Sequence, residues 1–184
     1  MIKALAFIYK KKGLSDSDFK NYYEKNHAPL AISLLTFEGY ERNFVNSNIN
    51  PLYDSLGSIS IFQYESIESL NLIEEKMSSD AGDILREDEL RFMDVAKNYF
   101  VLTQSDQLTE QRFKKKIFYP GSDMNDLRSL NSYKSLIQIS DNIIPESTEM
   151  FGIAEYGITE EASFEDLEKL TQKHPKAIIT SCVY

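Results

Sequence analysis

Short apolar runs, amphipathic stretches and turn residues alternate along the chain, and this alternation predicts its first elements. Residues 3–10 read KALAFIYK, an apolar run that is too short for a typical helix and is followed by a turn signal at Gly13. The run predicts a strand. Ser15 then offers an N-cap, and aromatic residues follow it at helical spacing. We therefore expect a helix over residues 16–26.

The proline at position 29 sets the expected end of this helix. Proline fixes its own φ angle and moves the preceding residue, here Ala28, away from helical angles. His27 is therefore expected at the end of the helix or just past it.

The rest of the first half reads as three strands and two helices. The expected strands are 39–45 (GYERNFV), 57–64 (GSISIFQY) and 99–103, and the expected helices are 69–77, opening at Ser66, and the stretch DELRFMDVA over 88–96. The acidic segment between the two helices reads as irregular.

The second half repeats this order in weaker form. Its expected strands are 113–119, 137–144, 149–158 and 177–184, and its expected helices are about 124–136, after a Pro120–Gly121 turn, and a helix capped by Ser163. His174, which follows the last helix, is expected to be its C-cap residue.

This order corresponds to two consecutive β-α-β-β-α-β halves, residues 1–108 and 109–184. Each ferredoxin-like half places its helices on one face of an antiparallel sheet. The first strand is apolar on both faces, so the face without helices also needs cover. The sequence therefore predicts an α+β fold in which tandem ferredoxin-like halves leave a barrel-like space between their sheets. The antiparallel sheets would pack face to face, with the helices outside and an apolar pocket between the sheets.

Composition adds limits on partners. With 42% hydrophobic residues in 184, the chain has enough apolar material for a sizeable core. Its 29 acidic and 20 basic side chains give a net charge of -9, which repels nucleic acid phosphates. The lysine runs at 10–12 and 114–116 are interpreted as solvated strand ends. We expect no nucleic-acid partner.

Cysteine use and hydropathy indicate the compartment. The lone Cys182 has no partner for an internal disulfide and is interpreted as a small buried hydrophobe, and no spacing of Cys and His resembles a zinc or redox motif. The N-terminal stretch does not have the order of a signal peptide, and no run of about 18 apolar residues occurs. A cytoplasmic protein with no membrane partner and no metal site is expected.

Four segments carry a family resemblance. They are KALAFIYKKKGLSDSDFKNYYEKNHAPL (3–30), GYERN (39–43), LYDSLGSISIF (52–62) and LREDELRFMD (85–94). Together they resemble the EthD family of the dimeric α+β barrel superfamily over roughly the first 105 residues. The second half lacks the His-Ala-Pro segment and resembles a diverged partner fused in tandem.

The resemblance implies a fold, a site and a set of chemistries. The ferredoxin-like units would pair through their sheets, within one chain or across a homodimer, and would work without a metal or organic cofactor. Relatives are similar to isomerases, decarboxylases and cyclases acting on lactones and polyketides, in which a histidine and a tyrosine border a pocket inside the barrel. The matching positions in this sequence are His27 and Tyr40.

The residue types at these positions suit proton transfer. Imidazole titrates near neutral pH, so His27 can give or accept a proton, although a histidine at a helix end can also simply bind loose carbonyls. Tyr40, Arg42 and Phe44 share one strand face. A phenol and a guanidinium there could hold an oxyanion, or they could be a core aromatic and a solvated cation.

Further candidates are assigned to substrate binding. Phe7, Tyr9 and Phe62 are expected pocket walls or, alternatively, plain core residues. Asp54 is either a turn former or a group that orients His27 or takes part in acid/base work.

Three functions remain open from the sequence. The first is a cofactor-independent enzyme, an isomerase, cyclase or decarboxylase, acting on a small aromatic, polyketide-like or lactone substrate through His27 and Tyr40. The second is a non-catalytic binding or accessory protein for a small hydrophobic molecule. The third is a cofactor-free monooxygenase.

Overall fold

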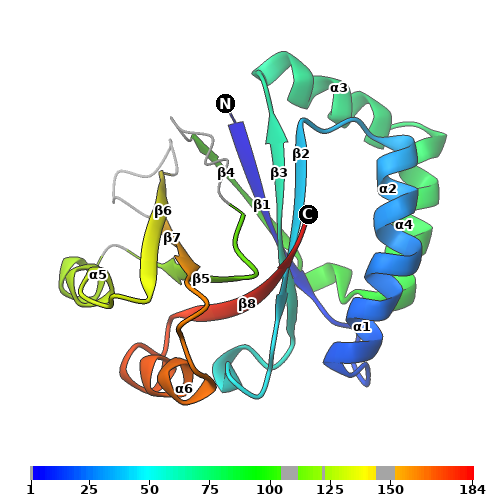
Figure 1. The fold of residues 1–184 in the computed structure, drawn as a ribbon. Coiled ribbons are helices and arrows are strands. Elements are labelled where there is room, and N and C mark those ends of the chain that lie inside the picture. Colours follow the sequence, from blue (N-terminus) through cyan, green and yellow to red (C-terminus); the bar gives the residue numbers. More distant parts are fainter. Residues whose placement is uncertain (1, 105–111, 122, 144–151) are drawn as a thin grey trace.

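One closed antiparallel barrel with helices on its outside forms the molecule (Figure 1). This is a computed structural model, and it describes residues 2–104, 112–121, 123–143 and 152–184. Within these residues the strand order around the barrel is β1-β3-β2-β8-β5-β7-β6-β4. The α+β class, the antiparallel sheets and the outer helices predicted from the sequence are confirmed.

The first half of the chain supplies four neighbouring strands. Its elements are β1 (Ile2–Tyr9), α1 (Asp16–Tyr22), the π-helix η1 (Tyr23–His27), α2 (Ala28–Leu34), β2 (Gly39–Val45), the 3-10 helix η2 (Pro51–Tyr53), β3 (Leu56–Tyr64), α3 (Ile67–Met77), α4 (Asp80–Phe92), the 3-10 helix η3 (Val95–Lys97) and β4 (Tyr99–Gln104). The strands lie in the order β4-β1-β3-β2.

The second half repeats that order as β8-β5-β7-β6. Its elements are β5 (Lys115–Pro120), α5 (Met124–Asn131), β6 (Leu136–Ile143), β7 (Gly152–Ile158), α6 (Phe164–Lys173) and β8 (Ile178–Val183). The expected boundary at 108/109 and the expected strand residues 144 and 149–151 lie outside the described residues.

The two halves join at two seams within one chain. At the first seam β2 pairs with β8 from Arg42–Val183 to Val45–Thr180. At the second seam β4 and β6 meet at the pair Gln104–Ile143, where both strands reach the edge of the described residues. One chain therefore provides both sheets of the barrel.

Apolar side chains from both halves fill much of the space between the sheets. Leu5 and Phe7 of β1 pack there with residues of the opposite sheet, including Phe118 and Ile178. These side chains occupy the space in which the sequence predicted an apolar pocket.

A buried ionic network lies next to this cluster and joins the two halves. Lys116 Nζ lies 2.7 Å from Glu41 and 2.6 Å from Glu155, and Lys3 Nζ lies 3.5 Å from Glu155. Burial disfavours the charged lysine, but Glu155 and Glu41 outweigh it and raise the pKa of Lys116. The prediction that both lysine runs are solvated was wrong for Lys116 and for Lys10, which is buried and paired with Asp16.

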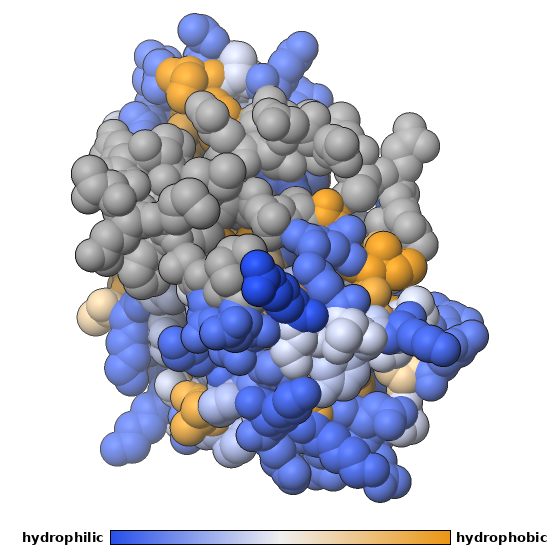
Figure 2. Space-filling model, turned by 90° about the vertical axis from the view of Figure 1, so that its left-hand side faces the viewer, coloured by the Kyte–Doolittle hydropathy of each residue, from blue (hydrophilic) through white to orange (hydrophobic). Residues whose placement is uncertain are grey.

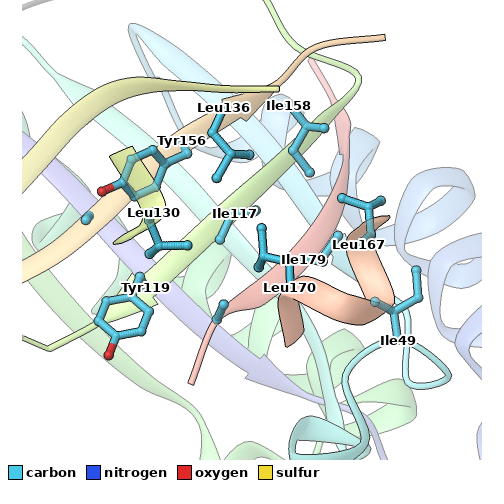
Figure 3. Close-up of a cluster of buried hydrophobic side chains, with 12 residues drawn as sticks. Ile49, Ile117, Tyr119, Leu130, Leu136, Tyr156, Ile158, Leu167, Leu170 and Ile179 are labelled. Atoms are coloured by element: carbon cyan, nitrogen blue, oxygen red, sulfur yellow. The ribbon is translucent and has the colours of Figure 1, made fainter. Parts of the chain in front are cut away.

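The outer face of the second half is covered by α5 and α6. Figure 3 shows Leu130 of α5 and Leu167 and Leu170 of α6 packing on strand residues such as Ile117. On the side of the molecule where α5 lies, the described residues form a mainly hydrophilic surface with small separate apolar patches (Figure 2).

Three helix predictions need correction. The helix expected over about 124–136 is shorter, because α5 ends at Asn131 and β6 already begins at Leu136. The segment before residue 88 was expected to be irregular, but α4 already starts at Asp80, because the side chain of Ser79 caps it by accepting from the N–H of Ala81. The helix expected to stop before Pro29 continues into α2. The π-helix turn over residues 23–27 makes this continuation possible, since Pro29 then falls in the first turn of α2, where its missing N–H is not needed.

Candidate functional site

A cavity of about 340 Å³ lies between the sheet of the first half and its helices, outside the barrel. Figure 1 shows α2, α3 and α4 on the same side of β1, β2 and β3. The walls are mainly apolar and include Leu35, Phe37, Leu70, Ile73, Met77 and Leu85. The polar side chains on its wall are His27, Tyr64, Glu74 and Glu89. A few polar groups in an apolar hollow are typical of small-molecule sites.

His27 enters this cavity from the π-helix and is held from behind by Asp88. Its Nδ1 lies 2.9 Å from Oδ2 of Asp88, and the other carboxylate oxygen accepts a hydrogen bond of 2.7 Å from the Tyr22 hydroxyl. Both His27 and Asp88 are buried. Since Nδ1 donates to the carboxylate, Nε2 is the nitrogen left to meet a ligand, and it has no hydrogen-bond partner among the described residues.

Burial lowers the pKa of His27, and the hydrogen bond and charge of Asp88 oppose this shift only in part. The neutral imidazole is therefore the form favoured at neutral pH, with Nε2 as a proton acceptor. The expected helix C-terminus, whose dipole would favour the charged form, is absent at His27 because the chain runs on into α2.

The π-helix is the local feature that places the histidine. The N–H of Ala28 bonds to the carbonyl of Tyr23, so this turn holds one more residue than an α-turn. Tyr23 and His27 lie four residues apart in this turn, and both are buried. Their rings meet edge to face at 5.0 Å between centroids.

Tyr40 does not line the cavity. Its hydroxyl donates to that of Tyr23 at 2.8 Å, and Tyr23 in turn lies 3.0 Å from the Ser60 hydroxyl. The Tyr40 ring stacks on Phe62, 4.7 Å between centroids, and Phe62 is a cavity wall. Tyr40 therefore contacts the site through Phe62, on the outer face of the sheet and not inside the barrel as expected.

Arg42 lies on the same face as Tyr40, as the alternation of the strand predicted. Its guanidinium binds Glu24 through two nitrogens at 3.0 and 3.2 Å and covers the Tyr40 ring at 4.8 Å. The guanidinium is thus held by a carboxylate of the chain itself. It does not line the cavity.

The remaining predicted residues lie on different sides of the sheet. Phe7 and Tyr9 face the barrel interior, where Phe7 stacks on Tyr99 at 4.6 Å. Asp54 is exposed in the turn before β3. Of the predicted substrate-binding residues, Phe62 is the one that the structure brings to the same cavity as His27.

Sequence reasoning missed Asp88, Glu89 and Tyr64. Asp88 and Glu89 belong to the quoted segment LREDELRFMD, but their faces could not be assigned because the start of α4 was misplaced. Burial raises the pKa of Tyr64 to about 12, and its hydroxyl makes no hydrogen bond within the described part of the chain. Strand alternation does place Tyr64 on the same face as Phe62, and that signal was available.

A second hollow of about 450 Å³ lies on the other side of Tyr64, against α3. Its charged lining residues, Glu38, Glu75 and Lys76, are exposed, and no histidine lines it. The smaller cavity at His27 is therefore the better candidate for chemistry, because its titratable groups have shifted pKa values.

The second half also buries a histidine, but there both ring nitrogens are occupied. His174 is the C-cap residue of α6, as predicted. Its Nδ1 lies 3.2 Å from Asp126 and its Nε2 lies 3.2 Å from Ser129. His174 thus ties α6 to α5 and is a structural residue.

The described residues include neither a candidate metal site nor a candidate membrane helix. No group of three or more His, Cys, Asp or Glu side chains in them could hold a metal ion. No helix among them is long and apolar enough to cross a membrane.

Known proteins resemble the chain in two ways. Residues 11–96 match the family model described as EthD domain. Among solved structures, a protein described as a putative chlorite dismutase has a TM-score of 0.55 and 10% identity, covering 100% of this chain and 94% of that chain. An EthD family protein from Bacillus halodurans C-125 has a TM-score of 0.41 and 20% identity, covering 57% of this chain and 99% of that chain. No curated protein matches the sequence.

Fold and site together define the class, an antiparallel α+β barrel protein with a small-molecule-sized cavity between sheet and helices. The segment 11–96, which contains His27 and Asp88, matches the family model of the EthD domain. The resemblance drawn from the sequence is confirmed for this segment. The likeness to the putative chlorite dismutase, at 10% identity, shows the fold alone.

Proposed function

We propose that the chain is a cofactor-independent enzyme that binds a small apolar molecule in the outer cavity and moves a proton with His27. The observation that carries this proposal is the orientation of the His27 ring. Asp88 binds Nδ1, whereas Nε2, at the cavity wall, has no hydrogen-bond partner among the described residues. A carboxylate behind a neutral imidazole stabilises the imidazolium that forms when Nε2 accepts a proton. Isomerisation, cyclisation and decarboxylation through an enolate are the reactions that such a base serves.

The cavity supports a small, largely apolar substrate. Its volume of about 340 Å³ falls at the lower end of the range for ligand sites. Phe62 and Phe37, whose rings lie 5.0 Å apart, offer faces on which an aromatic ring can pack.

Tyr64 takes the place of Tyr40 as the proposed oxyanion donor. Tyr64 lines the cavity, and its raised pKa keeps the hydroxyl protonated and able to donate to a developing enolate. The Tyr40 hydroxyl already donates to Tyr23, and its ring holds Phe62 in place. We assign to Tyr40 and Arg42 the role of positioning Phe62 in the cavity wall.

A second candidate function is a binding or accessory protein that holds a small hydrophobic molecule without changing it. The observation in its favour is that the predicted Tyr40 and Arg42 bind each other and Glu24, so neither reaches the cavity. Catalysis and binding differ in what His27 contributes. An enzyme loses turnover without it, whereas a binding protein loses at most some affinity.

The test separates binding from turnover in His27→Gln. Purified wild type and variant are screened by thermal shift against hydroxylated aromatics, lactones and β-keto acids, and each hit is followed by mass spectrometry for conversion. Ligand at 100 times its Kd adds about 2.7 kcal/mol of stability. Conversion by wild type and binding without conversion by His27→Gln support the enzyme. Equal conversion by both proteins contradicts it, and binding without conversion by either supports the accessory role.

A further inference from the structure

Glu89 is a carboxylate on the same cavity wall as His27. It follows one turn after Leu85, which also lines the cavity, and directly after Asp88. Consecutive helical residues point about 100° apart, so Asp88 can reach His27 from behind while Glu89 faces the hollow. Within the described residues, the Glu89 carboxyl has no ion pair and no hydrogen bond and feels only the charges of Arg86 and Asp88.

The surroundings of Glu89 and His27 favour the neutral form of each. Burial raises the pKa of Glu89, Arg86 opposes this shift and Asp88 adds to it. Burial also lowers the pKa of His27. The two pKa values start at 6.5 for the histidine and 4.5 for the carboxyl, and both shifts reduce this difference. They therefore increase the fraction of molecules in which a neutral base and a neutral acid are present together.

We propose that Glu89 is the acid partner of His27 and that the two groups carry out a 1,3-proton transfer on a small β,γ-unsaturated carbonyl compound. This inference rests on the proposed function of His27. It narrows the reaction to a double-bond isomerisation and makes Glu89 a catalytic residue.

The step balances without a further reactant. Nε2 of His27 takes a proton from the carbon between the carbonyl and the double bond, so a C–H bond breaks, an N–H bond forms and a dienolate results. The Glu89 carboxyl gives its proton to the γ carbon, so an O–H bond breaks and a C–H bond forms, and the double bond becomes conjugated with the carbonyl. Proton exchange with water, from the imidazolium and to the carboxylate, restores both groups.

Other titratable groups around the cavity bear on the pH profile. Those lining it or acting on Glu89 are Asp88 and Arg86 on α4, His27 on η1, Glu74 on α3 and Tyr64 on β3. Glu74 is exposed, and the raised pKa of Tyr64, about 12, puts its titration far above neutral pH. The rate should therefore fall on the acid side as His27 is protonated and on the alkaline side as Glu89 ionises.

The experiment uses 3-cyclohexen-1-one as the probe in deuterated buffer. Absorbance measures conversion to the conjugated ketone, and proton NMR measures deuterium entering the α and γ carbons. The proteins are wild type, Glu89→Gln, His27→Gln and Glu87→Gln. Glu87 is the matched control because it lies on the same helix, exposed and paired with Arg91. Circular dichroism confirms that each variant is folded.

Glu89→Gln is expected to lose conversion by about 10²-fold or more while it still exchanges the α proton. His27→Gln should lose both activities, and Glu87→Gln neither. If wild type exchanges the α proton through His27 but Glu89→Gln converts the probe at the wild-type rate, this inference fails and the proposed function stands. If wild type exchanges no α proton above the buffer rate, the proton-transfer function fails and the inference fails with it.

Discussion

Asp88 Oδ2 lies 2.9 Å from Nδ1 of His27, although the two residues stand 61 positions apart in the chain. The contact joins the π-helix after α1 to the last turns of α4. It fixes both the tautomer and the direction of the imidazole ring. The remaining ring nitrogen is thereby presented to the cavity, and the chemistry proposed for this protein depends on that arrangement.

Removing the charge of Asp88 should lower the pKa of His27 further. The carboxylate raises this pKa through its hydrogen bond and its charge, so in Asp88→Asn the effect of burial is no longer opposed. Proton NMR titration of the imidazole signals measures the change, and the chain has only 2 histidines to assign. Asp126→Asn, which alters the carboxylate beside His174, is the matched control and should leave His27 unchanged. An unchanged or higher His27 pKa in Asp88→Asn would contradict the structure.

The same substitution should also reduce turnover. An Asn amide can donate to Nδ1, which would place the imidazole proton on Nε2, the wrong tautomer for a base that faces the cavity. For conversion of a ligand found in the screen, we expect kcat to fall by about 10²-fold or more. Binding of that ligand, followed by thermal shift, should change little. A large loss of binding with unchanged kcat would show instead that Asp88 only shapes the cavity.

His27 should make the stability of the fold depend on pH in a definite direction. Its folded pKa lies below the ordinary 6.5, so between these two values the unfolded chain binds more protons than the folded one. The contribution of His27 is complete above pH 6.5 and is lost as the pH falls toward the folded value, by at most about 1.4 kcal/mol per pH unit. The raised pKa of Glu89 has the opposite effect: above pH 4.5 its contribution to the stability decreases as the pH rises.

Urea unfolding of wild type and His27→Gln between pH 5 and 7.5 isolates the histidine. The difference in unfolding free energy between the two proteins should shift in favour of wild type as the pH rises, because the variant no longer carries the titrating group. A difference that stays constant with pH would mean that His27 is not desolvated in the folded protein.

The sequence predicted the fold better than the site, for a physical reason. Hydrophobic period and turn residues are local, so strands such as 39–45 and the capped helix after Ser163 were predicted within a residue or two. Each strand has one face against helices and one face against the other sheet. Packing between distant segments decides which face is which. β1 is apolar on both faces, so its sequence could not show that Phe7 and the cavity at His27 lie on opposite sides.

The π-helix and the carboxylates show a second limit. Pro29 is an ordinary helix stop by its covalent geometry, but the helical path continues through it after the wider turn over residues 23–27, whose side chains Tyr23 and His27 are buried. In the sequence, nothing distinguishes Asp88 from the other acidic residues of a charged helix. Its pairing with a residue 61 positions away is a tertiary property.

Ligand binding in the cavity should be measurable by the fluorescence of an introduced tryptophan. The sequence contains no Trp, so a single one gives an unambiguous fluorescence signal. Phe100 lines the cavity and is 68% exposed, which makes Phe100→Trp a conservative change at its edge. A ligand from the screen should shift or quench the emission of this variant. Leu52→Trp, on η2 and 69% exposed, is the control and should not respond. Equal responses of both variants would place the ligand elsewhere or indicate nonspecific binding.

The ionic network inside the barrel should be sensitive to the loss of one partner. Lys116→Met leaves the buried carboxylates of Glu41 and Glu155 without their main cation, and breaking such a pair on one side costs about 3–5 kcal/mol. Urea unfolding measures this loss. The matched control is Lys114→Met, whose pair with Glu160 is exposed and screened by solvent, so that its loss should change the stability much less. Because Lys116 binds Glu41 of the other half, a loss as small as that of the control would mean that this network does not help to hold the two halves together.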